Sequence, residues 1–293
     1  MAQATPNGAS SSSVSGNESV SQLLARDDID GSEIRLGEVA GEGYFSRVYR
    51  GTWRGTEVAV KQLKNQVSSE QNMAEFQHEI QVTIFVNIEQ VNTLMGNHPR
   101  VVGFLGSSNR PPHLFMVFHF MPFGSLADLL VLRGEFPVDR SPSLGLAPEL
   151  LTEHVRQLTS MLVDASSGIL HCHARRVIHR DIAARNFLVD NFMRVTVCDF
   201  GMSRLLPADS DTGKMSGDSL VSVKWSAPEA LNFDGDGSVY SEKTDVFAFA
   251  IFMFEVASRE EPYAGLNLSA ASVVQEVRSG SLRPVIPPGW CRS

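Results

Sequence analysis

Four side chains have the types and the order that transfer of a phosphoryl group needs. The stretch 177–189 contains Asp181 and Asn186, and Asp199 follows further along within Asp-Phe-Gly, while Lys61 ends an apolar run far upstream. This reaction needs a carboxylate near the acceptor hydroxyl, oxygen ligands for magnesium and cations along the phosphates. The four residues supply all three.

A glycine-rich segment precedes the lysine and could approach phosphates with its backbone. It reads Gly41-Glu42-Gly43-Tyr44-Phe45-Ser46-Arg47-Val48. Glycines between two strands let backbone amides come close to phosphate oxygens. Alone the pattern is weak, because a Gly-x-Gly hairpin is more often a simple turn and Ser46 stands where the usual motif has its third glycine.

Lys61 by itself allows two interpretations. An inward-facing lysine at the end of an apolar strand needs an anionic partner, because an unpaired buried ammonium group is unfavourable. A lysine at a strand edge can also reach solvent along its flexible stem. The sequence around Val58-Ala59-Val60-Lys61 does not separate the two.

A further motif, Lys224-Trp225-Ser226-Ala227-Pro228-Glu229, completes an ordered set. With it, the chain resembles a protein kinase of the tyrosine kinase-like group, since the motifs occur in the order and at about the spacing of that family. The stretches 51–55 and 259–263 are typical of the group, and the resemblance covers roughly residues 34–290.

The resemblance implies roles for the residues that match the family motifs. Asp181 would orient the acceptor hydroxyl and take its proton, and Arg185 would do the work of the lysine found near this aspartate in serine/threonine kinases. Asn186 and Asp199 would hold Mg²⁺, and Lys61 would hold the α- and β-phosphates of ATP. The partner implied is a protein substrate.

The family also pairs this lysine with a glutamate on the first large helix, and two residues compete for that role. Glu79 has the expected local pattern, 76–80. Counting back from His98 favours Glu89, because the stretch from Glu79 to His98 is about ten residues longer than usual. The local pattern puts Glu79 ahead.

A flat adenine ring is expected between aliphatic walls and a hinge segment. The resemblance puts Phe118 in the gatekeeper position. The cofactor-binding residues expected from it, beside Lys61 and the glycine-rich segment from Gly41 to Ser46, are Ala40, Val48, Ala59, His119, Met121 and Leu188.

The nature of the acceptor hydroxyl is left open by two conflicting features. The run Ala183-Ala184-Arg185 resembles tyrosine kinases, whereas Ser222 occupies the position of a threonine in serine/threonine kinases. We expect serine or threonine ahead of tyrosine. The alternative to an active enzyme is a kinase fold that acts as a scaffold or nucleotide-binding regulator.

Three side chains near these motifs have expected supporting roles. His179 should pack the loop that carries Asp181, and Asp245 should anchor its backbone. Arg180 could pair with a phosphorylated residue, for which the candidates are Ser210, Thr212, Ser216 and Ser219.

Periodicity places these residues in an α+β chain with two lobes. Alternating apolar residues predict strands at 34–39, 48–53, 57–61, 101–105 and 114–120, and helical spacing predicts helices over 70–96, 149–173 and 243–258. Strands followed mostly by helices indicate a small antiparallel β lobe and a larger helical lobe, with a loop over 134–148.

The expected domain boundaries follow from this pattern and from the resemblance. Residues 1–33 form a Ser-rich segment that we expect to be disordered, and the kinase domain covers 34–293. Its N-lobe spans about 34–118, its hinge about 119–123 and its C-lobe about 124–293. Comparison with the family suggests that the C-lobe lacks its last helices.

Composition narrows the partners and the compartment. The net charge of -8 argues against nucleic acid or an anionic membrane surface as a partner. Three cysteines without zinc spacing favour a reducing compartment. With no apolar stretch long enough for membrane insertion and no targeting signal, a cytoplasmic location is the default, and the oligomeric state is unknown.

Overall fold

The computed structural model describes most of the chain, and its described ranges are 28–43, 46–64, 70–87, 98–110, 113–132, 148–215, 222–232 and 237–285. Tyr44, Phe45, Glu89, Ser216 and Ser219 lie outside them, as does the expected loop up to residue 147.

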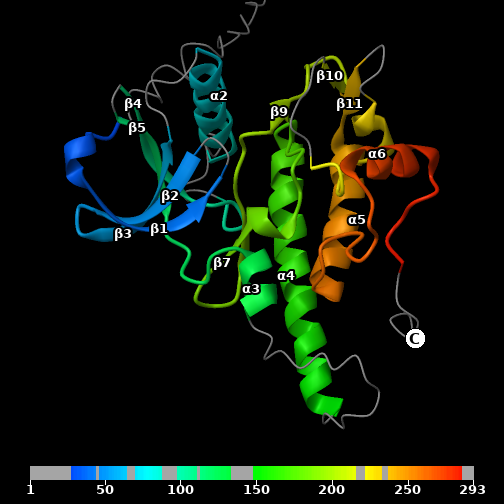
Figure 1. Ribbon diagram of the computed structural model, residues 1–293. Helices are drawn as coiled ribbons and strands as arrows, with labels where there is room; N and C mark the ends of the chain where they lie inside the picture. Colours follow the sequence, from blue (N-terminus) through cyan, green and yellow to red (C-terminus); the bar gives the residue numbers. More distant parts are fainter. Residues whose placement is uncertain are drawn as a thin grey trace, which may run out of the picture.

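The molecule is an α+β fold of two lobes, as expected, with a sheet and one helix on one side and a mostly helical lobe on the other (Figure 1). The first lobe has five antiparallel strands in the order β1-β2-β3-β5-β4. Their bounds are β1 (Ile34–Glu42), β2 (Ser46–Trp53), β3 (Thr56–Leu63), β4 (Phe104–Arg110) and β5 (His113–His119).

Strand alternation decides which way Lys61 points. Successive side chains of a strand face opposite sides of its sheet. On β3, Val58 and Val60 pack on one side with Phe115 and Val117 of β5. Lys61 directly follows Val60 and therefore faces the opposite side, toward the helix α2.

The helix α2 (Glu70–Asn87) covers that side of the sheet. Phe76, Ile80 and Ile84 recur at helical spacing and pack with Leu114 and Met116 of β5. The expected helix over 70–96 is therefore described as far as Asn87, and the remainder lies outside the described residues.

Two expectations for this lobe need correction. The strand expected over 101–105 begins only at Phe104, because Val101 forms a parallel bridge with Val197 of the other lobe and Val102 donates its N–H to the Val197 carbonyl. The segment expected to be disordered up to residue 33 is ordered from residue 28. Ile29 is buried against the sheet because its N–H pairs with the Ser107 carbonyl.

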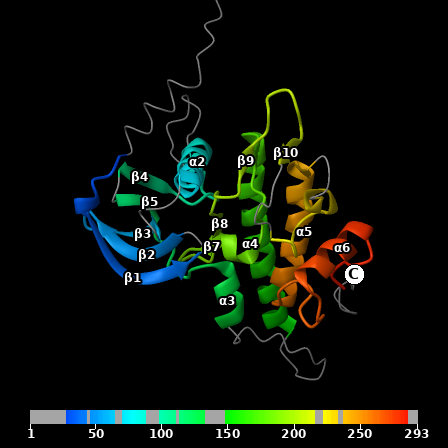
Figure 2. The same cartoon turned by 45° about the horizontal axis from the view of Figure 1, so that its top comes forward.

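The second lobe is organised around two long helices that lie side by side in both ribbon views (Figures 1 and 2). Its helices are α3 (Leu126–Leu132), α4 (Pro148–Ala174), α5 (Glu242–Ser258) and α6 (Ala270–Ser279). A capping box between Ser241 and Thr244 starts α5, and Arg259 ends it in the left-handed conformation.

Short strands and 3₁₀ turns hold the loops of this lobe. The strands form three antiparallel pairs: β6 (Val177–Ile178) with β9 (Arg204–Leu205), β7 (Phe187–Val189) with β8 (Val195–Val197), and β10 (Gly213–Met215) with β11 (Ser238–Tyr240). Its described 3₁₀ turns are η2 (Ala184–Asn186) and η3 (Pro228–Leu231), whereas η1 (Gly31–Glu33) precedes β1 in the first lobe.

A continuous apolar core supports these loops. Phe187 after η2 stacks on Phe252 of α5, with 4.4 Å between ring centroids, and both side chains are fully buried.

Within the described residues, no helix combines the length and the hydropathy that crossing a bilayer would require.

Candidate functional site

A cleft of about 570 Å³ opens between the two lobes and collects the residues that the sequence singled out. All of the expected site residues that the structure describes line it: Ala40, Gly41, Glu42, Gly43, Ser46, Val48, Ala59, Lys61, Glu79, His119, Met121, Asp181, Arg185, Asn186, Leu188 and Asp199. Phe118 also lines it, and Tyr44 and Phe45 fall outside the described residues.

Lys61 stands at the centre of the polar part of this cleft. Its Nζ donates to Glu79 Oε1 of α2 at 2.5 Å and to Asp199 Oδ1 at 2.9 Å. The ammonium group and Glu79 are both nearly buried, so this contact is only weakly screened by water. The geometry brings Lys61 together with Glu79, whereas Glu89 lies outside the described residues.

Burial and charge move the pKa values of this trio in opposite directions. Burial raises the pKa of Glu79 to about 6, although Lys61 opposes the shift. The Lys61 ammonium holds the pKa of Asp199 down to about 2. The two carboxylates together keep Lys61 protonated despite its burial, because they raise its pKa.

Asp181 lies at the other end of the polar region and has three side-chain neighbours. Its Oδ1 accepts from Ser222 Oγ at 2.6 Å and from Arg185 Nη2 at 2.5 Å. Its Oδ2 accepts from Asn186 Nδ2 at 2.7 Å. Arg185 also donates to Ser222 Oγ at 2.6 Å, so the two residues that conflicted in the sequence meet on the same carboxylate.

The backbone that carries Asp181 is anchored by α5, as expected. Asp245 is 1% exposed, and its carboxylate accepts from the N–H groups of His179 and Arg180 at 2.8 and 2.9 Å. His173 of α4 bonds to the same carboxylate at 2.8 Å. Arg180 itself has a positive φ of 68°, a conformation that these bonds help to fix.

His179 has the packing role that was expected. It is fully buried, its Nε2 lies 3.1 Å from the Cys198 carbonyl, and its ring meets Phe200 edge to face at 5.5 Å. Cys198 lines the cleft, and burial raises the pKa of its thiol, so it is present there as the neutral thiol.

The described part of the glycine-rich segment lines one edge of the cleft. Gly41 pairs with Val48 across β1 and β2, and the Gly43 N–H donates to the Ser46 carbonyl at 2.9 Å. The carboxylate of Glu42 forms ion pairs with Lys64 and Arg47. The hydrogen bond from Lys64 is the largest cause, and that from Arg47 the next, of the fall of its pKa to about 2. The segment can therefore offer backbone, not the Glu42 side chain, to an anion.

Oxygen ligands for a hard cation are present, although in small number. Among the described residues, no group of three or more His, Cys, Asp or Glu side chains could hold a metal ion. Asp199 and Asn186 supply one carboxylate and one amide oxygen beside the cleft. This set fits Mg²⁺, which is commonly held by one or two protein oxygens together with water and phosphate oxygens.

Two contributors to the site were missed by the sequence argument. Glu255 of α5 accepts from the Ala184 N–H and from Trp225 Nε1, both at 2.9 Å, and so joins the loop after Asp181 to the Trp225 segment. Burial raises its pKa. A single carboxylate at the end of the apolar run of α5 was the available signal.

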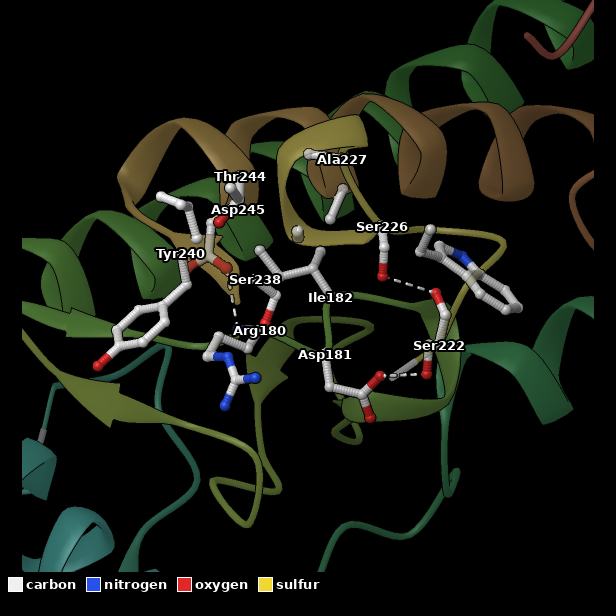
Figure 3. Close-up of a pocket in the computed structure, with 14 residues that line it drawn as sticks. Arg180, Asp181, Ile182, Ser222, Ser226, Ala227, Ser238, Tyr240, Thr244 and Asp245 are labelled. Carbon is white, nitrogen blue, oxygen red and sulfur yellow. Dashed lines mark hydrogen bonds between the residues drawn. The ribbon is translucent and has the colours of Figure 1, made fainter. Parts of the chain in front are cut away.

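Tyr240 is the second missed residue. A small pocket beside the cleft has Asp181 and Ser222 on one side and Arg180 and Tyr240 on the other (Figure 3). Arg180 Cζ lies 5.1 Å from the centroid of the Tyr240 ring. The expected pairing of Arg180 with a phosphorylated residue stays a prediction.

Comparison with known proteins agrees with this geometry. The model of the family described as protein tyrosine and serine/threonine kinase matches residues 34–291. The relatives include two proteins of Dictyostelium discoideum. "Probable serine/threonine-protein kinase drkC" is 35% identical over 89% of this chain and 31% of its own length. "Probable serine/threonine-protein kinase drkA" is 32% identical over 91% of this chain and 36% of its own length.

The chain spans about a third of the length of these two relatives. A virus-encoded relative, of Acanthamoeba polyphaga mimivirus, carries serine/threonine-protein kinase/receptor in its name and is 32% identical over 88% of this chain and 14% of its own length. The Dictyostelium relatives are consistent with the tyrosine kinase-like group. Since the family model covers most of the sequence, the chain belongs to the protein tyrosine and serine/threonine kinase family.

Proposed function

We propose that the chain transfers the γ-phosphate of ATP, in the presence of Mg²⁺, to a serine or threonine hydroxyl of a protein substrate. The observation that carries the proposal is the arrangement of Asp181 and Lys61 in one cleft, each with the partners that its role requires. Asp181 would accept the proton of the acceptor hydroxyl, and Lys61 would neutralise phosphate charge.

The pairing with Glu79 supports the role of Lys61. A lysine held from one side by a helix carboxylate keeps its position and its charge when an anion enters the cleft. Asp199, the second partner, has an exposed side chain and can exchange the ammonium for another cation. The apolar residues Ala40, Val48, Ala59 and Leu188 line the cleft and suit a flat base.

Mg²⁺ would supply neutralisation of the phosphates during transfer. Asp199 and Asn186 would hold it, while Lys61 stays paired with Glu79. Asn186 Nδ2 is already used on Asp181, so its amide oxygen is the atom available for a cation.

The contact between Ser222 and Asp181 supports an aliphatic hydroxyl as acceptor. Ser222 Oγ bridges Asp181 and Arg185, and this hydroxyl position corresponds to the threonine of serine/threonine kinases. The names of the relatives agree, although they describe those proteins and not this chain. The arginine trait shared with tyrosine kinases is accommodated because Arg185 contacts the same oxygen as Ser222.

A peptide-library assay tests activity and hydroxyl preference together. The purified chain is incubated with a mixed peptide library, ATP and Mg²⁺, and phosphorylated residues are identified by mass spectrometry. We expect phosphoserine and phosphothreonine, and no transfer by Asp181→Asn. Transfer only to tyrosine would overturn the preference, and a folded protein that binds nucleotide without transfer would favour the scaffold alternative.

A further inference from the structure

The Tyr240 ring packs directly on the backbone of Gly213. The two residues pair across β10 and β11. A methyl group added at Gly213 would lie 2.1 to 2.5 Å from the hydroxyl oxygen and two ring carbons of Tyr240, a separation that real side chains do not show. Glycine at 213 therefore lets the hydroxyl end of the ring lie against β10, which belongs to the 199–229 segment; we define this segment by its described residues, 199–215 and 222–229.

The same ring lies against Arg180, the neighbour of Asp181. The Arg180 guanidinium is 5.1 Å from the ring centroid, and its Nη1 donates to the Met202 carbonyl at 3.0 Å. Figure 3 shows the two side chains together on one side of the small pocket, with the Arg180 backbone held by Asp245. An aromatic face attracts a guanidinium, and more strongly where water is excluded.

The buried positive charge of Arg180 gives the Tyr240 ring an electrostatic role beside its packing. Burial lowers the pKa of Arg180 to about 10, and the neighbouring Arg204 guanidinium lowers it further; burial also lowers the pKa of Arg204. Across the described part of the chain, neither guanidinium forms an ion pair with a carboxylate. The Tyr240 ring therefore joins the Met202 carbonyl and the nearby Asp245 and Asp181 carboxylates in offsetting the charge of Arg180.

We infer that Tyr240 is a positioning residue, which holds the 199–229 segment and the Asp181 loop together by packing on Gly213 and on Arg180, without requiring a phosphate on the segment. The inference rests on the proposed function for its kinetic consequence. Asp181 directly follows Arg180 and its carboxylate accepts from Ser222, so a shift of the Asp181 loop would separate the carboxylate from this hydroxyl.

Kinetics of phosphatase-treated protein test this inference. We expect Tyr240→Ala to lower kcat about tenfold, in line with loss of a partly buried cation–π contact. The KM for ATP should not change, since Tyr240 is absent from the nucleotide cleft lining. Tyr240→Phe keeps the ring and should restore kcat to within about twofold of the original. Phe192→Ala removes a ring that is 82% exposed and serves as the control.

A double-mutant cycle tests the glycine contact itself. Gly213→Ala should lower kcat in the original chain, because the methyl group pushes the ring away, and should have no further effect in Tyr240→Ala, where the space is empty. Equal effects of Gly213→Ala in both backgrounds would overturn the contact. A loss of activity in Tyr240→Phe as large as in Tyr240→Ala would also overturn the inference.

Phosphatase treatment tests whether the segment needs a phosphate to keep its position. If phosphatase treatment inactivates the original chain as much as Tyr240→Ala does, a phosphate and not the ring holds the segment. If the original chain transfers no phosphate at all, the proposed function fails, and trypsin cleavage after Lys214 of β10 then decides. We expect about tenfold faster cleavage in Tyr240→Ala than in the original chain or Tyr240→Phe, and equal rates would overturn the inference.

Discussion

At the scale of single residues, the central feature is a lysine shared between two carboxylates of opposite pKa behaviour. Glu79 is buried with a raised pKa, and Asp199 has a lowered one. Desolvation disfavours the charged form of Glu79, and the ammonium of Lys61 favours the charged form of Asp199. The pair with Glu79 is therefore the one that acidification breaks first.

This order predicts a pH dependence of activity. As the pH falls through about 6, Glu79 takes up a proton, its negative charge disappears, and its attraction for Lys61 weakens. We expect kcat/KM to decline along this acidic limb. The measurement is a pH profile of peptide phosphorylation between about pH 5 and 8.

The control for this profile is Glu79→Gln, which has no charge to lose at this position. The variant should have low activity at neutral pH and no limb near pH 6. An unchanged limb in Glu79→Gln would assign the titration to another group.

The hydroxyl of Ser222 allows a second prediction for one residue. Ser222→Ala removes the hydrogen bonds to Asp181 and Arg185, and we expect kcat to fall at least tenfold, because a tenfold change corresponds to about 1.4 kcal/mol and even one hydrogen bond to a charged group contributes about 1.5 to 3 kcal/mol. The KM for ATP should stay the same. Steady-state kinetics with Ser222→Thr, which keeps the hydroxyl, provide the comparison, and a full loss in that variant would contradict the role of the hydroxyl.

At the scale of elements, strand and helix patterns identified most of what positions the site. The alternation in Val58-Ala59-Val60-Lys61 could be read from the sequence, and it turns Lys61 toward α2. The strand at 101–105 was placed too early, because two valines suit a buried connection as well as a strand. Their partner, Val197, lies far away in the sequence.

The unpredicted part of the site consists of contacts between distant elements. Glu255 looked like the polar end of an apolar helix, and its contacts with Ala184 and Trp225 have no local signal. Tyr240 was missed for the same reason, because its partners Gly213 and Arg180 come from two other segments. The choice of Glu79 over Glu89 depended on a local pattern, and spacing alone favoured the other residue.

The anchoring of the Asp181 loop by α5 gives a prediction for stability. Asp245→Ala leaves the buried N–H groups of His179 and Arg180 without an acceptor, and His173 loses its partner. We expect the free energy of unfolding to fall by about 3 kcal/mol or more, since each unsatisfied buried group costs about 1 to 3 kcal/mol. Urea unfolding measures the change. Asp211→Ala, at a side chain that is 98% exposed, should change it by less than about 0.5 kcal/mol.

At the scale of the whole molecule, the site exists only where the two lobes meet. Lys61 and Glu79 belong to the sheet and its helix, whereas Asp181, Asn186 and Asp199 belong to the other lobe. The ion pair between Lys61 and Asp199 crosses this boundary in the structure. A ligand that bridges the same groups should therefore stabilise the molecule as a unit.

Thermal unfolding with nucleotide tests this coupling. A non-hydrolysable ATP analogue with Mg²⁺, at about a hundred times its Kd, adds about 2.7 kcal/mol of stability, which corresponds to a rise in Tm of roughly 5 to 10 °C. Asp199→Asn weakens the cation site, so its Tm should respond to the analogue equally with and without Mg²⁺. The exposed-site variant Phe192→Ala should respond like the original chain. If the Tm does not change with the analogue at any concentration, nucleotide binding has to be removed from the proposed function, because a ligand that binds the folded state must raise its stability.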